Sequence, residues 1–209
     1  MCDGQYRQMQ NYLRDQEHMI HNINMVEEVT DFLQYFYHDL NIEIIDLVHL
    51  MLQTLIEMCV GNTHNLVIIS NKQIITIINR ILLINISDYD EEIPSESAVR
   101  AEDTTCSSPA PSQITMKTKS IDLKGSAVEL LEAMLEETSY QTKDLMQLIA
   151  GVLDVSALHD TLGDFYKLKD DPDVKRERFD DDAQRGLFRT YHILVHLADN
   201  PEIHIDDLG

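Results

Sequence analysis

Glycine and proline are scarce in this chain of 209 residues, which has seven of the first and five of the second. Both residues mark turns and strand ends, so their scarcity argues against a fold built from many strands. The glycines form no phosphate-cradling loop, dinucleotide fingerprint or nucleophile elbow. We therefore expect a protein that is not an enzyme.

Cysteine is also rare, and Cys2, Cys59 and Cys106 form no C-x-x-C pair. An odd number of such widely spaced cysteines argues against a disulfide framework. No basic region followed by an apolar region opens the chain, so no signal peptide is visible. The longest apolar run, residues 74–86, is interrupted by Asn79 and Arg80. It is shorter than the roughly 18 residues that a membrane span needs, so we expect a buried helix and no transmembrane segment.

Positive charge is the third shortage, because 16 Lys and Arg residues face 37 Asp and Glu residues, a net charge of −21. A nucleic-acid-binding protein needs cations that displace counterions from phosphates, so that class is excluded. Anionic membrane surfaces are disfavoured for the same reason. Cations and basic partners remain, since a field of one sign raises their local concentration.

Apolar residues recur at intervals of three and four along most of the chain, which predicts helices. The first stripe is Met9, Tyr12 and Leu13, and we expect its helix to begin upstream of residue 1 because no capping residue precedes it. Asn24 is the expected N-cap of the second helix, and Gly61 is expected to stop the third. The second stripe contains Met25, Val26, Val29, Phe32, Leu33 and Phe36.

These stripes predict an all-α fold, an armadillo-like α-solenoid or a bundle of about eight helices. Residues 88–119 contain prolines among Ser, Thr, Asp and Glu, a composition typical of a disordered acidic linker. We therefore divide the chain into a helical unit at 1–87, a linker at 88–119, a second helical unit at 120–200 and a tail at 201–209.

Two blocks, residues 1–14 and 53–62, each place one carboxylate among apolar neighbours. Asp3 follows Met1 and Cys2, and Glu57 lies between Ile56 and Met58 on a predicted buried helix. A carboxylate in such surroundings needs a compensating partner, and a calcium ion is one candidate. The alternative is a pair of ordinary solvated acids.

The two blocks resemble the inositol trisphosphate receptor and ryanodine receptor families of intracellular calcium-release channels. The shared pattern is apolar-Cys-acid, then Q-N-aromatic-L-R, and later T-L-x-E-x-C-x-G. Residues 123–134 and 191–194 resemble later parts of the same cytosolic region, the RIH-associated domain that precedes the pore. Three features differ: Asp3 stands where the family has Glu, Gly61-Asn62 stand where it has Gly-Pro-Cys, and the segment between Leu33 and Leu47 is shorter than in the family.

The resemblance implies a cytosolic regulatory segment that couples calcium binding to gating, on the cytosolic face of the endoplasmic or sarcoplasmic reticulum. Asp3 and Glu57 would be calcium ligands, with a third ligand from a domain absent here, so the isolated chain should bind Ca²⁺ weakly. The partners implied are the other domains of the channel, as a homotetramer. The inositol trisphosphate receptor is slightly preferred, because the block at 123–131 resembles it more, although residues 11–14 and 166–170 favour the ryanodine receptor.

Other constellations carry less chemistry. Residues 88–93 imitate the start of an EF-hand loop, but Ile93 stands where Gly is needed, and residues 180–182 also lack that Gly. His192 and His196 share a helix face without the Glu of a zinc protease motif, so ordinary amphipathic histidines are expected. The alternative function is a helical scaffold or adaptor, unrelated to channels, that binds partner peptides.

Overall fold

The computed structural model describes residues 6–17, 19–37, 44–84, 111–136, 143–168 and 180–199, of which 111–117, 143–144 and 180–182 are described by their backbone alone. Helices dominate these ranges, which contain no strand, and the predicted all-α class is confirmed. The helices are α1 (Arg7–Arg14), α2 (Met25–Phe36), α3 (Ile45–Cys59), α4 (Thr63–Asn71), α5 (Ile74–Leu82), α6 (Pro111–Glu136), α7 (Lys143–Val152), α8 (Val155–Leu168) and α10 (Asp180–Ala198).

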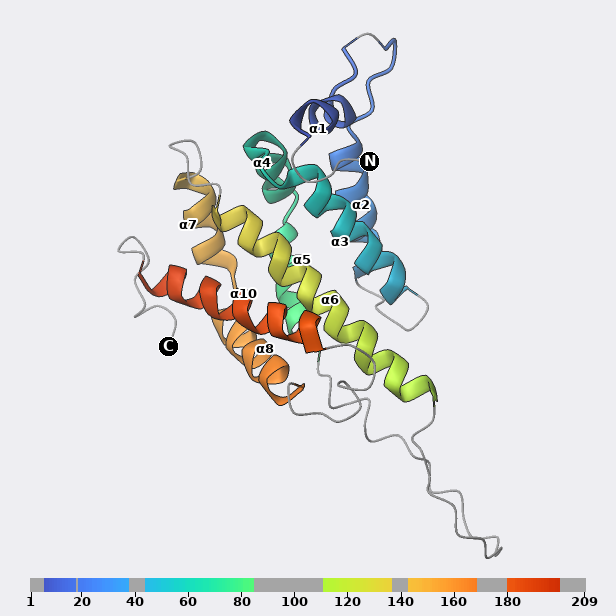
Figure 1. Ribbon diagram of the computed structural model, residues 1–209. Coiled ribbons are helices and arrows are strands. Elements are labelled where there is room, and N and C mark those ends of the chain that lie inside the picture. The colour runs from blue at the N-terminus through green and yellow to red at the C-terminus, as the bar shows by residue number, and fades with distance from the viewer. Residues whose placement is uncertain are drawn as a thin grey trace, which may run out of the picture.

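The longest of these helices, α6, runs through the middle of the molecule (Figure 1). It packs against α3 and α5, which precede it in the chain, and against α10, which follows it. Farther from α6, the helix α2 packs along α3, and the helix α8 packs along α10. Residues of both predicted helical units therefore contribute to one continuous hydrophobic core.

Burial of α6 on several sides explains its composition. Ile121, Ala127, Leu130 and Ala133 are all buried, although they point in different directions around the helix. A helix with water on one side carries an apolar stripe, whereas one enclosed by neighbours is apolar over most of its circumference. The central position of α6 thus follows from its sequence.

The start of α6 corrects the predicted linker. The helix begins at Pro111, so residues 111–119, which were assigned to the disordered segment 88–119, are helical. Near the end of that stretch, the ammonium of Lys119 lies 2.5 Å from a carboxylate oxygen of Asp46 in α3. The remainder of the predicted linker, 88–110, and the tail at 201–209 lie outside the described residues.

An ion pair between a buried lysine and a partly exposed aspartate joins α6 to α8. Lys124 is 1% exposed, and its Nζ donates to Oδ2 of Asp164 at 2.7 Å. Removing one partner from such a pair leaves an uncompensated charge in the protein interior, which is strongly unfavourable. The pair therefore fixes α8 against α6 in one arrangement.

The polar residues that interrupt the apolar run 74–86 have specific partners. Asn79 on α5 donates from Nδ2 to the carbonyl of Val152 at 2.7 Å and accepts from the backbone N–H of Asp154 at 2.9 Å. It thus satisfies both backbone groups at the turn between α7 and α8. The next residue, Arg80, lies with its guanidinium carbon 5.9 Å from the centroid of the Tyr37 ring, a cation–π geometry.

Two predicted helix boundaries are confirmed. The side chain of Asn24 accepts hydrogen bonds from the backbone N–H groups of Val26 and Glu27 and so caps α2. Beyond the end of α3, Gly61 has a φ of 71°, a left-handed conformation that favours glycine.

Within the described ranges, no single helix has both the length and the hydropathy to cross a membrane. One bent pair, Leu145–Val152 followed by Val155–Leu168 at 77°, meets those two criteria together.

The close approach of α8 and α10 gives a test of the packing. A Cβ added at Gly186 would lie 2.6 Å from Cζ and 2.7 Å from Cε1 of Phe165, a buried ring. We expect Gly186→Ala to lower the free energy of unfolding by about 1–3 kcal/mol, because the ring must move within a full core. Urea unfolding of the whole chain measures this.

The matched control is Gly163→Ala on α8, where an added Cβ meets no atom within 4 Å. Alanine favours a helix interior over glycine, so this variant should gain about 0.5–1 kcal/mol. Equal effects of the two substitutions would contradict the packing of α10 on α8.

Candidate functional site

Glu57, the second of the two predicted calcium ligands, lies near the C-terminal end of α3. Its neighbours Leu55, Ile56 and Met58 are buried, but the Glu57 side chain is exposed, since it points away from the core. The prediction that it is a carboxylate in apolar surroundings is therefore wrong. Burial does not force this group to recruit a cation.

Asp3, the first predicted ligand, lies outside the described residues, so its pairing with Glu57 stays a prediction. The first helix begins at Arg7, and Tyr6 before it has the non-helical angles φ −85° and ψ 74°. The prediction that this helix begins upstream of residue 1 is thus wrong, and Asp3 precedes α1. No group of three or more His, Cys, Asp or Glu side chains suited to a metal occurs in the described part of the chain.

The region beside Glu57 is organised by α1, whose buried residue is Gln10. Gln10 is 1% exposed, and its Nε2 donates to the backbone carbonyls of Glu57 at 2.9 Å and Val60 at 3.0 Å. The last carbonyls of a helix lack partners within the helix itself. One amide group from α1 thus completes the hydrogen bonding at the end of α3.

Three further side chains of α1 extend this contact, and we call the whole set the α1–α3 polar clamp. Arg7 donates to the carbonyl of Gly61 at 2.9 Å, and Arg14 donates to Oδ1 of Asn65 at 2.8 Å. Asn11 accepts through Oδ1 from Nδ2 of Asn62 at 3.0 Å. The clamp consists of Arg7, Gln10, Asn11 and Arg14 from α1 with Glu57, Val60, Gly61, Asn62 and Asn65 from the α3–α4 region.

The two asparagines of the clamp also shape the turn between α3 and α4. Asn62 caps α4 by accepting from the backbone N–H of Asn65, and Asn65 donates from Nδ2 to the carbonyl of Met58 at 2.7 Å. Both side chains are at most 3% exposed. The turn that follows Glu57 is therefore held by side chains from both sides.

The polar clamp corrects the predicted stripe of the first helix. Met9 and Tyr12, expected in the core, are 38% and 53% exposed. Leu13, the third member of that stripe, is partly buried against the core. The contacts with α3 and α4 are instead made by polar residues of α1, which recur at intervals of three, one and three: 7, 10, 11 and 14. That spacing was available in the sequence, but a search for apolar stripes passes over it.

Cys59, the cysteine of the second resembling block, is fully buried, and burial raises the pKa of its thiol well above the usual range. It therefore stays protonated and packs as a small apolar residue, without nucleophilic or metal-binding character.

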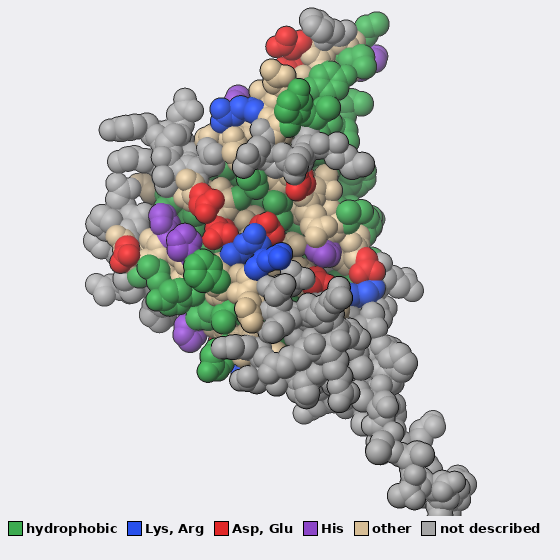
Figure 2. Space-filling model, viewed as in Figure 1, with side chains coloured by type: hydrophobic (Ala, Val, Ile, Leu, Met, Phe, Trp, Pro, Cys, Tyr) green, Lys and Arg blue, Asp and Glu red, His purple; other side chains and the backbone are tan. Residues whose placement is uncertain are grey.

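One of the two histidines singled out on α10, His192, lies beside an acidic side chain of α6. Nδ1 of His192 is 3.3 Å from Oε1 of Glu132, and its ring stacks on Phe188. The neighbouring Arg189 pairs with Glu129 at 2.8 Å and with Glu132 at 3.1 Å. Figure 2 shows such Lys and Arg side chains next to Asp and Glu on one face. The EF-hand-like segment 88–93 lies outside the described residues, as do the side chains of 180–182.

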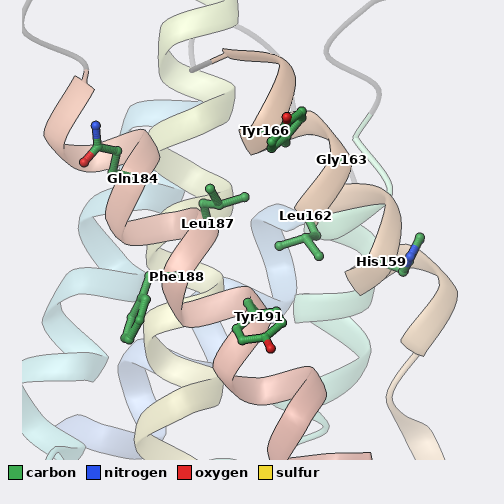
Figure 3. A pocket seen from close by; sticks show the side chains of 8 residues that line it. All are labelled: His159, Leu162, Gly163, Tyr166, Gln184, Leu187, Phe188 and Tyr191. Carbon is green, nitrogen blue, oxygen red and sulfur yellow. The ribbon is translucent and has the colours of Figure 1, made fainter. Parts of the chain in front are cut away.

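A groove with a volume of about 700 Å³ lies between α8 and α10 (Figure 3). Its lining is mainly apolar and aromatic, including Leu162, Tyr166, Leu187, Phe188 and Tyr191, with His159 and Gln184 as polar members. Tyr166 and Phe188 are 61% and 69% exposed. None of the predicted calcium ligands lines it, so it is a feature separate from the polar clamp.

The polar clamp can be tested through Gln10. We expect Gln10→Ala to lower the free energy of unfolding by about 1–3 kcal/mol, because two carbonyls at the end of α3 lose their donor in a buried position. Gln10→Glu keeps the size but replaces the donor with an acceptor, so its loss should be at least as large. Thermal and urea unfolding measure both.

The control is Gln8→Ala, an exposed glutamine on the same helix. It should change stability by less than about 0.5 kcal/mol. If Gln8→Ala and Gln10→Ala were equally destabilising, the polar clamp would not be what holds α1.

Comparison with known proteins finds a family model that is similar to part of the chain. Residues 1–82 match the family model described as RyR and IP3R Homology associated. No curated protein and no solved structure matches the chain. The matched range spans α1 to α5 and contains the whole polar clamp with Glu57. It does not decide between the two kinds of receptor. Residues 1–82 of this chain are thus similar to the RyR and IP3R Homology associated family.

Proposed function

We propose that this chain is a cytosolic regulatory segment of an intracellular ligand-gated calcium-release channel, in which Asp3 and Glu57 contribute to a calcium site that is coupled to gating. The observation that carries the proposal is the position of Glu57 within the matched family region, at the end of α3 held by the polar clamp. The protein acts by binding and does not catalyse a reaction.

Exposure of Glu57 suits an ion shared between domains. A calcium ion takes six to eight oxygen ligands, often from carboxylates and backbone carbonyls together. Two acids underfill that shell, so further ligands come from another domain of the channel. An exposed carboxylate can meet such a domain, whereas a buried one could not.

Rigidity of the supporting turn matters for coupling. Calcium that bridges two domains shifts their equilibrium only by its difference in affinity between the open and closed arrangements. A carboxylate on a fixed helix end transmits that difference, because the polar clamp resists local rearrangement. The remaining domains, assembled as a homotetramer on the cytosolic face of the endoplasmic or sarcoplasmic reticulum, complete the mechanism.

The net charge of −21 supports attraction of a cation but does not select a site. The test must therefore separate binding at Glu57 from diffuse attraction. Titration of the whole chain with Ca²⁺, followed by NMR shifts of backbone amides, should show saturable changes at Arg7, Gln10 and Gly61. We expect a dissociation constant on the order of 10⁻⁴–10⁻³ M or weaker.

Glu57→Gln should remove those shifts, and Asp3→Asn should reduce the affinity at least about tenfold. Glu17→Gln, which removes an exposed acid outside the polar clamp, is the matched control and should leave them unchanged. Tight stoichiometric binding that survives both ligand substitutions would refute the site, and shifts lost equally in all three variants would indicate diffuse attraction only.

A further inference from the structure

The outer face of α2 carries aromatic and acidic side chains that the core does not use. Val26, Thr30 and Leu33 form the inner face and are fully buried. The outer face is formed by Met25, Glu28, Phe32 and Tyr35, spaced three, four and three residues apart.

Phe32, Tyr35 and Met25 are 55%, 76% and 37% exposed, although Phe32 and Met25 were predicted within the core stripe of this helix. That prediction is wrong for these two residues. Hydrophobic side chains gather in Figure 2 along the edge where Figure 1 places α2. The exposed area is therefore a continuous face of one helix.

This face is hollowed by a groove of about 350 Å³, lined by Glu28, Asp31, Phe32, Tyr35 and Phe36. The rings of Tyr35 and Phe36 meet edge to face, with centroids 5.2 Å apart. That contact is favourable and limits the movement of both rings. The groove thus offers apolar walls with two carboxylates on them.

A lysine of the chain already pairs with one of these carboxylates. Nζ of Lys72, at the end of α4, donates to both oxygens of Asp31, at 2.9 and 3.1 Å. The hydrogen bond to Asp31 is the main cause of a raised pKa of Lys72, and the fields of Asp31, Glu27 and Glu28 add to it. Residues 24–37 contain those three acids and no Lys or Arg, so the face remains anionic after this pairing.

Comparison with the groove between α8 and α10 indicates what kind of partner the groove on α2 would bind. The α8–α10 groove is larger and aromatic, but none of the described side chains that line it is a carboxylate, so they do not select a partner by charge. On α2 the apolar and acidic groups are interleaved, which selects a cationic partner with apolar side chains. The net charge of −21 opposes a second copy of this chain and an anionic membrane.

We propose that the outer face of α2 binds a basic amphipathic helix of a partner polypeptide. Its apolar side chains pack on Phe32 and Tyr35, and its Arg or Lys side chains pair with Glu28 and Asp31 and lie over the rings. The spacing of Met25, Glu28, Phe32 and Tyr35 is that of a heptad seam, which favours a partner helix crossing at about 20°. This interface is independent of the calcium site at Glu57.

The test uses the whole chain and a fluorescent helical peptide with Leu on one face and Arg on its flanks, followed by anisotropy. We expect a dissociation constant on the order of micromolar. A peptide with Glu in place of Arg, and one of the same composition with its Leu residues scattered around the helix, should each bind at least about tenfold more weakly.

Matched variants distinguish specific binding at this face from nonspecific electrostatic attraction and nonspecific apolar contact. Phe32→Ser and Tyr35→Ser should each weaken binding about tenfold or more, whereas Phe188→Ser in the α8–α10 groove should not. Glu28→Lys and Glu17→Lys change the net charge equally, but only Glu28→Lys should weaken binding beyond about twofold at 150 mM salt. Circular dichroism of each variant checks that the fold is kept, which the exposure of all these side chains favours.

Several results would overturn the proposal. Equal effects of Phe32→Ser and Phe188→Ser would show nonspecific apolar contact, and equal effects of the two Lys variants would show diffuse electrostatics. Dimerisation in sedimentation that Phe32→Ser abolishes would assign the face to a second copy. Binding to phosphatidylcholine–phosphatidylserine vesicles that Phe32→Ser abolishes would assign it to a membrane.

Discussion

Completion of the hydrogen bonds at the end of α3 is the constraint around which the matched region is arranged. Helix ends leave carbonyls without partners, and here the partner is a buried glutamine amide from a helix that precedes α3 by more than thirty residues. Because α1 contributes little apolar area, polar contacts fix its position. The orientation of the turn after Glu57, and hence of Glu57 itself, follows from them.

Much of the architecture could be predicted from the sequence because most of its helices bury apolar side chains in the usual periodic way. The class of the fold, the cap at Asn24 and the stop at Gly61 follow from spacing and from local backbone chemistry. The linker boundary was wrong because residues 111–119 have a polar composition, while their helicity comes from continuity with the apolar part of α6. Periodicity alone does not show such extension.

The site was harder to predict, because its structure depends on polar contacts between segments that are distant in the sequence. The spacing of Arg7, Gln10, Asn11 and Arg14 predicts that they share one helix face. It does not predict which backbone carbonyls accept their hydrogen bonds. Asn79 likewise reads as a residue that excludes a membrane span, and only the structure shows its two backbone partners near Val152. The exposure of Glu57 depends on which side of α3 faces α6, a fact of tertiary packing.

The central place of α6 has a consequence for where the folding unit of this chain ends. The helices α3 and α5, both within residues 1–82, bury apolar side chains against α6, which begins beyond residue 82. A polypeptide cut at the end of the matched range would expose that surface to water and lose the contacts that order it. The matched range 1–82 is therefore smaller than the unit that folds. The apolar side chains of α6, beyond that range, complete the core that α3 and α5 begin.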